Sequence, residues 1–344
     1  MKKVGILTGG GDCPGLNAVI RGVTRKLNSA GVDVIGLMEG WRGMLTGDSI
    51  PLDWSNTDDI VGEGGTILGS SRTNPYKNEV RDIPQLKKIW GELELDALVA
   101  IGGDDTLGVA TKLYHKENLR VVGCPKTIDN DLSSTDYTFG FDTSINAAME
   151  CIDRLVTTTR SHRRVCVVEC MGRHAGWITA YAGMASGADV VLVPEKPFDL
   201  DVVCEILKKN RDRGKLYNLV VVSEGATFSK NDFVTQDAQV DDFGHVKLGG
   251  VGKALAGMIA KRTGWEVREQ VLGHLQRGGA PTAADRVLGT RFGLKAASLV
   301  LDGDFGKMVA LRGSSIVAVP LKEATGTLKI LTQDVLEDLD AFMG

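Results

Sequence analysis

Short apolar runs alternate with longer amphipathic stretches along most of this 344-residue chain. The short runs are rich in Val, Ile and Leu, which favour strands, and the longer stretches repeat apolar residues at helical spacing. Strands are predicted at residues 4–7, 32–37, 97–101, 120–123, 165–170, 190–193, 218–222 and 308–311, and helices at 16–30, 106–116, 144–158 and 201–211. Such alternation predicts an α/β fold in which helices cover parallel sheets.

Three of the predicted strands run directly into a glycine-rich or acidic turn. The turns are GGGDCPG at residues 9–15, GGDDT at 102–106 and PKTIDND at 125–131. The carboxyl ends of parallel strands meet at one edge of a sheet, which is where α/β proteins bind their ligands. Free backbone N–H groups and carboxylates at that edge predict a phosphate and metal site.

Composition narrows the class of protein. A net charge of -4 and an aromatic content of 6% give no reason to expect a nucleic acid or an anionic membrane as partner. The 43 glycines exceed the roughly 24 that average usage of about 7% would give, and their position after strands fits tight turns close to a ligand. The length exceeds that of a single core and favours two lobes.

Cysteine usage and the N-terminal residues bear on the compartment. The six cysteines show no CxxC spacing, and together with five histidines they form no zinc pattern. The chain begins without the apolar core of a signal peptide and contains no run of membrane-spanning length. We therefore expect a cytoplasmic protein with reduced thiols.

Five motifs follow one another along the chain: GGDCPGLN at 10–17, GGD at 102–104, PKTIDND at 125–131, MGR at 171–173 and GHLQRGG at 273–279. In this order they resemble the 6-phosphofructokinase family, and Asp105 and Lys126 resemble its bacterial pyrophosphate-dependent branch. The resemblance implies two interleaved Rossmann-like three-layer lobes with mainly parallel sheets. Residues 1–140 plus about 276–320 would form the phosphoryl-donor lobe, and residues 141–275 plus about 321–344 the sugar-phosphate lobe. The polar stretch 229–248 is expected to be a surface loop or hairpin.

Phosphoryl transfer requires a base, charge neutralisation and usually a metal ion. Asp129 is the candidate base that accepts the proton of the sugar 1-hydroxyl. Thr127 would hydrogen-bond the sugar or the transferring phosphoryl group, and Asp131 would hold the metal-phosphate or orient the turn. By resemblance Asp104 coordinates Mg²⁺ and Gly11 cradles phosphate. Each block taken alone also has a purely structural explanation. Gly11 fits a glycine-rich turn, Asp104 fits a helix N-cap, and residues 127–131 fit an Asx-rich turn.

The resemblance also assigns the residues that bind the sugar phosphate. These are Arg164, Arg268, His274 and Arg277 for the 6-phosphate, and Met171, Gly172 and Glu224 for the sugar. Arg173 and Arg72 would neutralise the transferring phosphoryl group. Since Arg164 and Arg268 reach in from a neighbouring subunit in the family, a homodimer or homotetramer is expected.

Two residues bear on the phosphoryl donor. Where ATP-using relatives have glycine after the metal aspartate, this chain has Asp105. A carboxylate about 4 Å from a nucleotide phosphate would cost roughly 4 kcal/mol at an effective dielectric near 20, nearly a thousandfold in affinity. Lys126 could neutralise pyrophosphate, although some ATP-dependent members share it. The sequence thus favours pyrophosphate and fructose 6-phosphate as substrates, with an ATP-dependent kinase as the alternative.

Two other hypotheses remain open at this stage. A non-catalytic sugar-phosphate sensor would show a broken catalytic set, whereas the set here is intact. Nucleotide-effector positions of bacterial ATP-dependent relatives correspond to Arg21, Arg25 and Arg154, and Arg213 with Lys215 lies near another. Arginines on helices are, however, mostly solvated or engaged in ion pairs between subunits.

Overall fold

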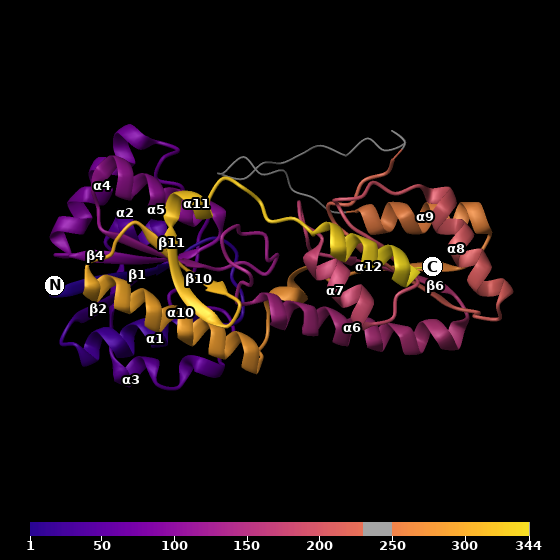
Figure 1. The fold of residues 1–344 in the computed structure, drawn as a ribbon, viewed down its shortest axis with the longest axis horizontal. Coiled ribbons are helices and arrows are strands. Elements are labelled where there is room, and N and C mark those ends of the chain that lie inside the picture. Colours follow the sequence, from indigo (N-terminus) through magenta and orange to yellow (C-terminus); the bar gives the residue numbers. More distant parts are fainter. Residues whose placement is uncertain (230–249, 344) are drawn as a thin grey trace. The chain divides into compact units, whose positions relative to one another are not determined.

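The computed structural model describes residues 1–229 and 250–343 (Figure 1). Its described residues divide into two compact units. Unit 1 contains residues 1–143 and 277–328, and unit 2 contains residues 144–229, 250–276 and 329–343. Of the loop or hairpin predicted at 229–248, all residues but the first lie outside the described residues.

Unit 1 is built on a sheet whose described strands run in the order β11-β10-β5-β4-β1-β2-β3. Their bounds are β1 (Lys3–Thr8), β2 (Asp33–Leu37), β3 (Ser49–Leu52), β4 (Ala97–Gly102), β5 (Val121–Pro125), β10 (Lys307–Arg312) and β11 (Ser315–Pro320). The strands from β2 to β10 pair in parallel, while the edge strands β3 and β11 are antiparallel to their neighbours. The interior strands are buried on both faces, as their continuous apolar sequence predicts.

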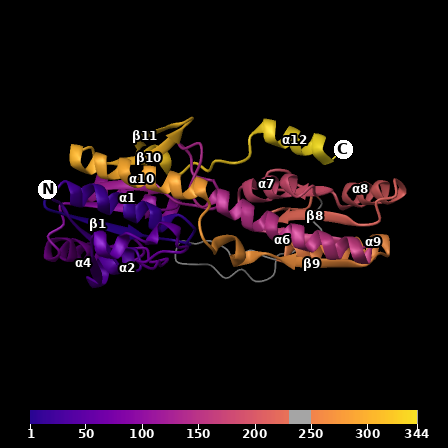
Figure 2. The same ribbon diagram turned by 90° about the horizontal axis from the view of Figure 1, so that it is seen from below.

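Helices cover both faces of this sheet (Figure 2). They are α1 (Leu16–Ser29), α2 (Trp41–Thr46), α3 (Trp54–Thr57), α4 (Glu79–Glu92), α5 (Asp104–Glu117), α10 (Ala283–Asp302) and α11 (Leu321–Ala324). Helices α1 and α10 pack backbone to backbone, since a Cβ at Gly293 would lie 2.4 Å from the carbonyl oxygen of Val19 and one at Gly22 2.8 Å from that of Thr290. Glycine is therefore required on both sides of this contact.

Unit 2 contains a four-stranded parallel sheet in the order β7-β8-β6-β9 within the described residues. Its strands are β6 (Val165–Cys170), β7 (Val190–Leu192), β8 (Asn218–Ser223) and β9 (Val267–Val271). Its helices are α6 (Phe141–His162, which starts in unit 1), α7 (Trp177–Ala185), α8 (Leu200–Asp212), α9 (Val251–Thr263), the short η2 (Gly273–Arg277) and α12 (Gln333–Met343). Apolar residues of α8 and α9 share one core with β6, β7 and β8.

The predicted α/β class with mainly parallel sheets is confirmed, and every predicted strand is present. Helices α5 and α6 begin two or three residues before the predicted starts because acidic residues favour the first helical turn. The six cysteines are all free, and five of them are buried. Across residues 1–229 and 250–343, none of the helices combines the length and apolar content needed to cross a bilayer.

Candidate active site

The three turns highlighted by the sequence lie next to one another in unit 1. Strands β5, β4 and β1 are parallel neighbours, so their carboxyl ends share one sheet edge. The pairing continues beyond the strands, because Gly9 N–H donates to the Ile101 carbonyl at 2.9 Å and Lys126 N–H donates to the Gly102 carbonyl at 2.9 Å. The predicted convergence of these turns is therefore observed.

The glycine turn after β1 presents its N–H groups rather than its carbonyls. Ser70 Oγ donates to the Gly10 carbonyl, Lys126 Nζ to that of Gly11, and Arg277 Nη1 to that of Asp12 at 3.1 Å. Within the described residues the N–H groups of Gly11 and Asp12 make no hydrogen bond. Because the carbonyls of this turn already accept hydrogen bonds while two of its N–H groups do not donate any, the turn is suited to bind an anion such as phosphate.

A hollow of about 540 Å³ opens in front of this turn. A Cβ at position 11 would lie 2.7 Å from Arg277 Nη1, so a side chain there would have to displace the Arg277 guanidinium. Gly10 has φ +80°, a conformation that favours glycine. Besides residues 10–12, the hollow is lined by Thr66, Gly69, Ser70, Ser71 and Arg72. Arg72, predicted to neutralise phosphoryl charge, thus borders the same space as Gly11.

Lys126 carries a buried positive charge into the glycine turn. Its side chain extends from the end of β5, is 4% exposed, and donates to the Gly11 carbonyl. Burial lowers the pKa of Lys126, and the charge of Arg277 lowers it further, whereas Asp12 and Asp129 raise it. Two cations and two carboxylates therefore act on one another beside the phosphate cradle.

The turn after β5 is held in a defined conformation by its own hydrogen bonds and by Thr138. Asp129 N–H donates to Thr127 Oγ1 at 3.1 Å, and Thr127 Oγ1 donates to Asp131 Oδ1 at 3.1 Å. Thr138, which is fully buried, donates its hydroxyl to the Thr127 carbonyl at 2.9 Å and its N–H to Asn130 Oδ1 at 3.2 Å. Asn130 has φ +51°, in the left-handed region that asparagine tolerates. Asp129 and Asp131 are thus carried on a fixed turn.

Two carboxylates, Asp104 at the start of α5 and Asp131 in the turn after β5, can serve a hard cation. Burial raises the pKa of Asp131, the Thr127 hydroxyl lowers it, and the negative charge of Asp104 raises it. Asp104 is exposed at the start of α5, and its Oδ1 accepts from Gly326 N–H at 3.2 Å. The described residues contain no cluster of three or more metal-binding side chains. Because Mg²⁺ carried by phosphates needs only one or two carboxylates, Asp104 with Asp131 fits that requirement.

In unit 2, three of the predicted sugar-binding residues gather at one edge of the sheet. Met171 follows β6, Glu224 follows β8 and His274 lies in η2 after β9, and these strands are parallel neighbours. Glu224 N–H donates to the Cys170 carbonyl at 2.9 Å, and Met171 N–H donates to Gln276 Oε1 at 3.3 Å. The structure brings these residues together on adjacent strand ends.

The backbone of Gly172 and Arg173 fits closely against the turn after β8. Gly172 has φ +138°, and its carbonyl accepts from Ser223 Oγ at 2.6 Å and from Gly225 N–H at 3.1 Å. A Cβ at Gly225 would lie 1.9 Å from the Arg173 carbonyl oxygen. Glycine at both positions lets the two turns interlock, which fixes where Arg173 leaves the backbone.

Two other predicted residues lie at the opposite end of that sheet. Arg164 immediately precedes β6, and Arg268 is paired with Cys166 near the start of β9. Both donate to Glu266 Oε1, at 3.2 Å from Arg164 and 3.0 Å from Arg268. Met171 lies seven residues after Arg164, about 23 Å along a strand. Within one chain these arginines are therefore separated from the other sugar-site candidates.

Four of the basic residues at or near possible effector positions contact other groups of the described chain. Arg25 is paired with Asp58 and lies 4.4 Å over the Trp54 ring, while Arg154 contacts Glu150 at 3.3 Å. Lys215 contacts Asp189 at 2.5 Å, and Arg21 Nε donates to the Asp58 carbonyl at 3.0 Å. These basic residues thus contact groups of their own chain, whereas the alternative to an effector site was solvation or ion pairs between subunits.

Sequence reasoning did not anticipate several polar side chains at the site. Thr138, Ser70 and Gln276 each bond the backbone of a turn that carries a candidate residue. The only local signal was that Gln276 lies inside the GHLQRGG motif and Ser70 just before Arg72. Their partners are remote in sequence, 60 residues away for Ser70 and 105 for Gln276.

Comparison with known proteins gives matches over almost the whole chain. A pyrophosphate–fructose 6-phosphate 1-phosphotransferase of Streptomyces coelicolor is 56% identical over 99% of this chain and 100% of its own length. An ATP-dependent 6-phosphofructokinase of Mycobacterium tuberculosis is 46% identical over the same shares. The solved structure of a pyrophosphate-dependent phosphofructokinase from Marinobacter aquaeolei superposes with a TM-score of 0.81 at 25% identity, covering 100% of this chain and 92% of that one. The Phosphofructokinase family matches residues 3–300, and the chain belongs to that family.

Proposed function

We propose that this chain transfers a phosphoryl group from pyrophosphate to fructose 6-phosphate, giving fructose 1,6-bisphosphate and phosphate. The 1-hydroxyl oxygen forms the new bond to phosphorus while the bridging P–O bond of pyrophosphate breaks. The hydroxyl proton passes to Asp129, and the leaving phosphate keeps the electron pair of the broken bond. The resemblance to the pyrophosphate-dependent branch implies a reaction near equilibrium, so we expect it to run in either direction.

Each part of this transfer has a candidate residue in unit 1. The N–H groups of Gly11 and Asp12 would bind the donor phosphates, and Arg72 on the same hollow would neutralise their charge. Lys126 would add a fixed positive charge beneath them. Asp129, on the turn held by Thr138, would act as the general base.

A magnesium ion, when bound with pyrophosphate, would neutralise phosphate charge and polarise the bond that breaks. Asp104 and Asp131 are the residues that would hold it, since both are oxygen donors at the ends of adjacent strands. Within the chain, Thr127 would keep Asp131 oriented through its hydroxyl. The six free cysteines suit a reducing, cytoplasmic setting for this reaction.

The observation that carries the choice of donor is Asp105 in the first turn of α5, directly after Asp104, where the family resemblance implies that a nucleotide would need space. Lys126, which is buried against the Gly11 carbonyl, would help to neutralise pyrophosphate but does not discriminate between the donors. Initial rates with fructose 6-phosphate and Mg²⁺ should therefore be high with pyrophosphate and low with ATP. Asp105→Gly should raise the rate with ATP. A wild-type enzyme that prefers ATP would refute the donor assignment and leave the family unchanged.

We also propose that the sugar-phosphate site is completed by a second copy of the chain. Its support is the separation of Arg164 and Arg268 from Met171, Glu224 and His274 along the sheet. The test mixes Arg164→Ala with Asp129→Asn, each inactive alone. Random reassembly into dimers should restore about a quarter of the wild-type activity, because half of the dimers are mixed and each has one intact site. No recovery in mixed dimers would place both residues in the same chain's site.

A further inference from the structure

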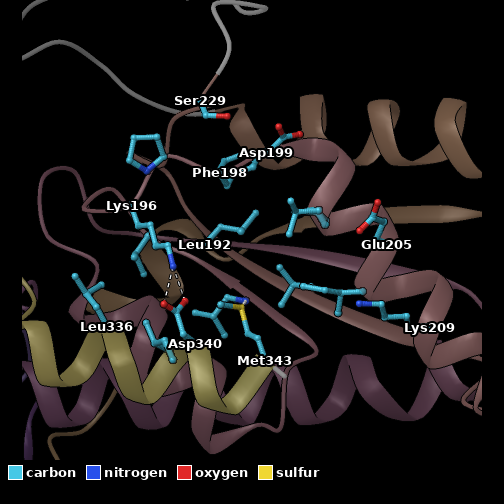
Figure 3. Close-up of a pocket in the computed structure, with 18 residues that line it drawn as sticks. Leu192, Lys196, Phe198, Asp199, Glu205, Lys209, Ser229, Leu336, Asp340 and Met343 are labelled. Atoms are coloured by element: carbon cyan, nitrogen blue, oxygen red, sulfur yellow. Dashed lines mark hydrogen bonds and ion pairs between the residues drawn. The ribbon is translucent and has the colours of Figure 1, made fainter.

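A cavity of about 550 Å³ lies at the outer edge of the unit 2 sheet (Figure 3). It opens beside β7, the end strand of that sheet, between helices α8 and α12. None of its lining residues belongs to the candidate active site. It is thus a separate feature, built from residues 190–209, Ser229 and the C-terminal helix.

The walls of this cavity are mainly apolar. Helix α8 contributes Val202 and Ile206, and α12 contributes Leu336 and Leu339, spaced so that each pair shares one helix face. Val202 is 54% exposed although it is apolar. The remaining apolar lining comes from β7 and the loop after it, from Val203 on α8 and from Met343 on α12. Exposed apolar surface of this kind is an unfavourable feature unless something covers it.

Helix α12 is fixed in place, so it does not close the cavity itself. Lys196 contacts Asp340 on α12 at 2.6 Å. At the end of the helix, the Met343 sulfur accepts from the N–H of Val191 on β7 at 3.2 Å. These two contacts hold the C-terminal part of α12 against β7 and the loop that follows it.

The two lysines that line the cavity differ in whether an acidic side chain neutralises them. Lys196 is neutralised by Asp340, as the dashed lines in Figure 3 show. Lys209 has no ion pair and no side-chain hydrogen bond within the described residues, and its ammonium points from α8 toward the interior (Figure 3). Glu205 and Asp199 also line the cavity, and Asp199 caps α8 by accepting from Asp201 N–H at 2.8 Å. Lys209 is therefore the group that an anionic ligand would meet.

The volume of about 550 Å³ and the mainly apolar lining of this cavity fit a small-molecule site. Small-molecule sites are typically about 300–1,000 Å³, mostly apolar, with a few polar groups. We propose that the cavity binds a linear alkyl carboxylate, with its chain between α8 and α12 and its carboxylate at Lys209.

The proposal is tested with decanoate, below its micellar concentration, on the full-length protein. Isothermal titration calorimetry should show saturable binding, and the methyl signal of Met343 should shift in spectra of protein labelled with ¹³C-methyl methionine. Val202→Trp should weaken binding at least tenfold by filling the cavity, with Val80→Trp, at a 93% exposed valine, as matched control. Lys209→Ala should weaken it about two- to fivefold, as for an exposed ion pair, whereas the neighbouring Lys208→Ala should not.

Decanol serves as the head-group control. It should bind more weakly than decanoate, and its affinity should not depend on Lys209. Absence of decanoate binding at millimolar concentration would overturn the proposal. So would binding that leaves the Met343 signal unmoved or that Val202→Trp does not weaken. Tighter binding of decanol than decanoate would refute the role of Lys209 and with it the ligand class.

Discussion

Replacing Thr138 by valine should disable the candidate catalytic turn without changing its own residues. Valine has nearly the same shape but cannot donate to the Thr127 carbonyl, which Thr138 Oγ1 reaches at 2.9 Å in a fully buried contact. An unsatisfied buried carbonyl costs about 1–3 kcal/mol. A chain of this size should therefore lose roughly 2–10 °C in its melting midpoint. The turn that carries Asp129 would lose one of its two anchors to Thr138.

The kinetic effect should exceed the effect on substrate binding. A catalytic group displaced by about 1 Å can lose 10²-fold in rate, so kcat for the variant should fall about 10- to 100-fold with KM for fructose 6-phosphate nearly unchanged. Thr138→Ser keeps the hydroxyl and should restore kcat to within about twofold. Steady-state kinetics with pyrophosphate, together with thermal unfolding, would measure both quantities.

The matched control is Thr24→Val. Thr24 is also fully buried in unit 1, but its hydroxyl has no hydrogen-bond partner within the described residues. Removing that hydroxyl should be neutral or stabilising and should leave kcat intact. If Thr138→Val unfolds earlier yet keeps its kcat, Thr138 supports the fold only. If Thr24→Val destabilises the protein as much as Thr138→Val, the hydrogen-bond argument itself is wrong.

Three other predictions concern Ser70, Asp285 and Cys13. Ser70→Ala removes the hydrogen bond to the Gly10 carbonyl and should raise KM for pyrophosphate about fivefold while leaving that for fructose 6-phosphate unchanged in steady-state assays. Burial raises the pKa of Asp285 above its usual 3.8, so the folded state keeps this proton to higher pH than the unfolded chain. Urea titrations should show the stability of the wild type, relative to Asp285→Asn, falling as pH rises from about 4 toward 7, and a constant difference would contradict the assignment. Burial raises the pKa of Cys13 to about 12, so mass spectrometry after iodoacetamide treatment at neutral pH should find Cys151, which is only partly buried, modified long before Cys13.

Local sequence was sufficient to predict an element where one strand and the turn after it contain all the residues on which the prediction depends. The apolar run ending at Gly102 predicts a buried strand and, with Asp104, an acidic helix start, and both are observed. The neighbourhood of three such turns followed from the rule that parallel strands end together. The fold and the cluster of candidate residues at the β1, β4 and β5 ends were therefore predictable without coordinates.

The features that could not be predicted from the sequence depend on partners far away in the chain or on an unusual pattern of burial. Strand β9 was missed because its exposed residues, Arg268 among them, lack the apolar pattern of an interior strand. Helix α10 was missed because it is apolar on several sides and packs through Gly293 against α1. The contact of Ser70 with Gly10 spans 60 residues and involves a common hydroxyl. No local pattern distinguishes such a residue from a solvated serine.

The candidate site on each sheet differs in whether one chain can supply all of its residues. Along the edge formed by β1, β4 and β5, a single chain supplies the N–H groups that would bind phosphate, a buried lysine and the carboxylates. In unit 2 the sheet holds Met171 at one end and Arg164 at the other, and a rigid strand of about 20 Å separates them. No rotamer change can span that distance, so a sugar phosphate touching both residues must lie between two chains. If the sugar phosphate binds between two chains, binding requires assembly of those chains. Activity should then decline when dilution produces monomers, although the glycine turn after β1 stays intact.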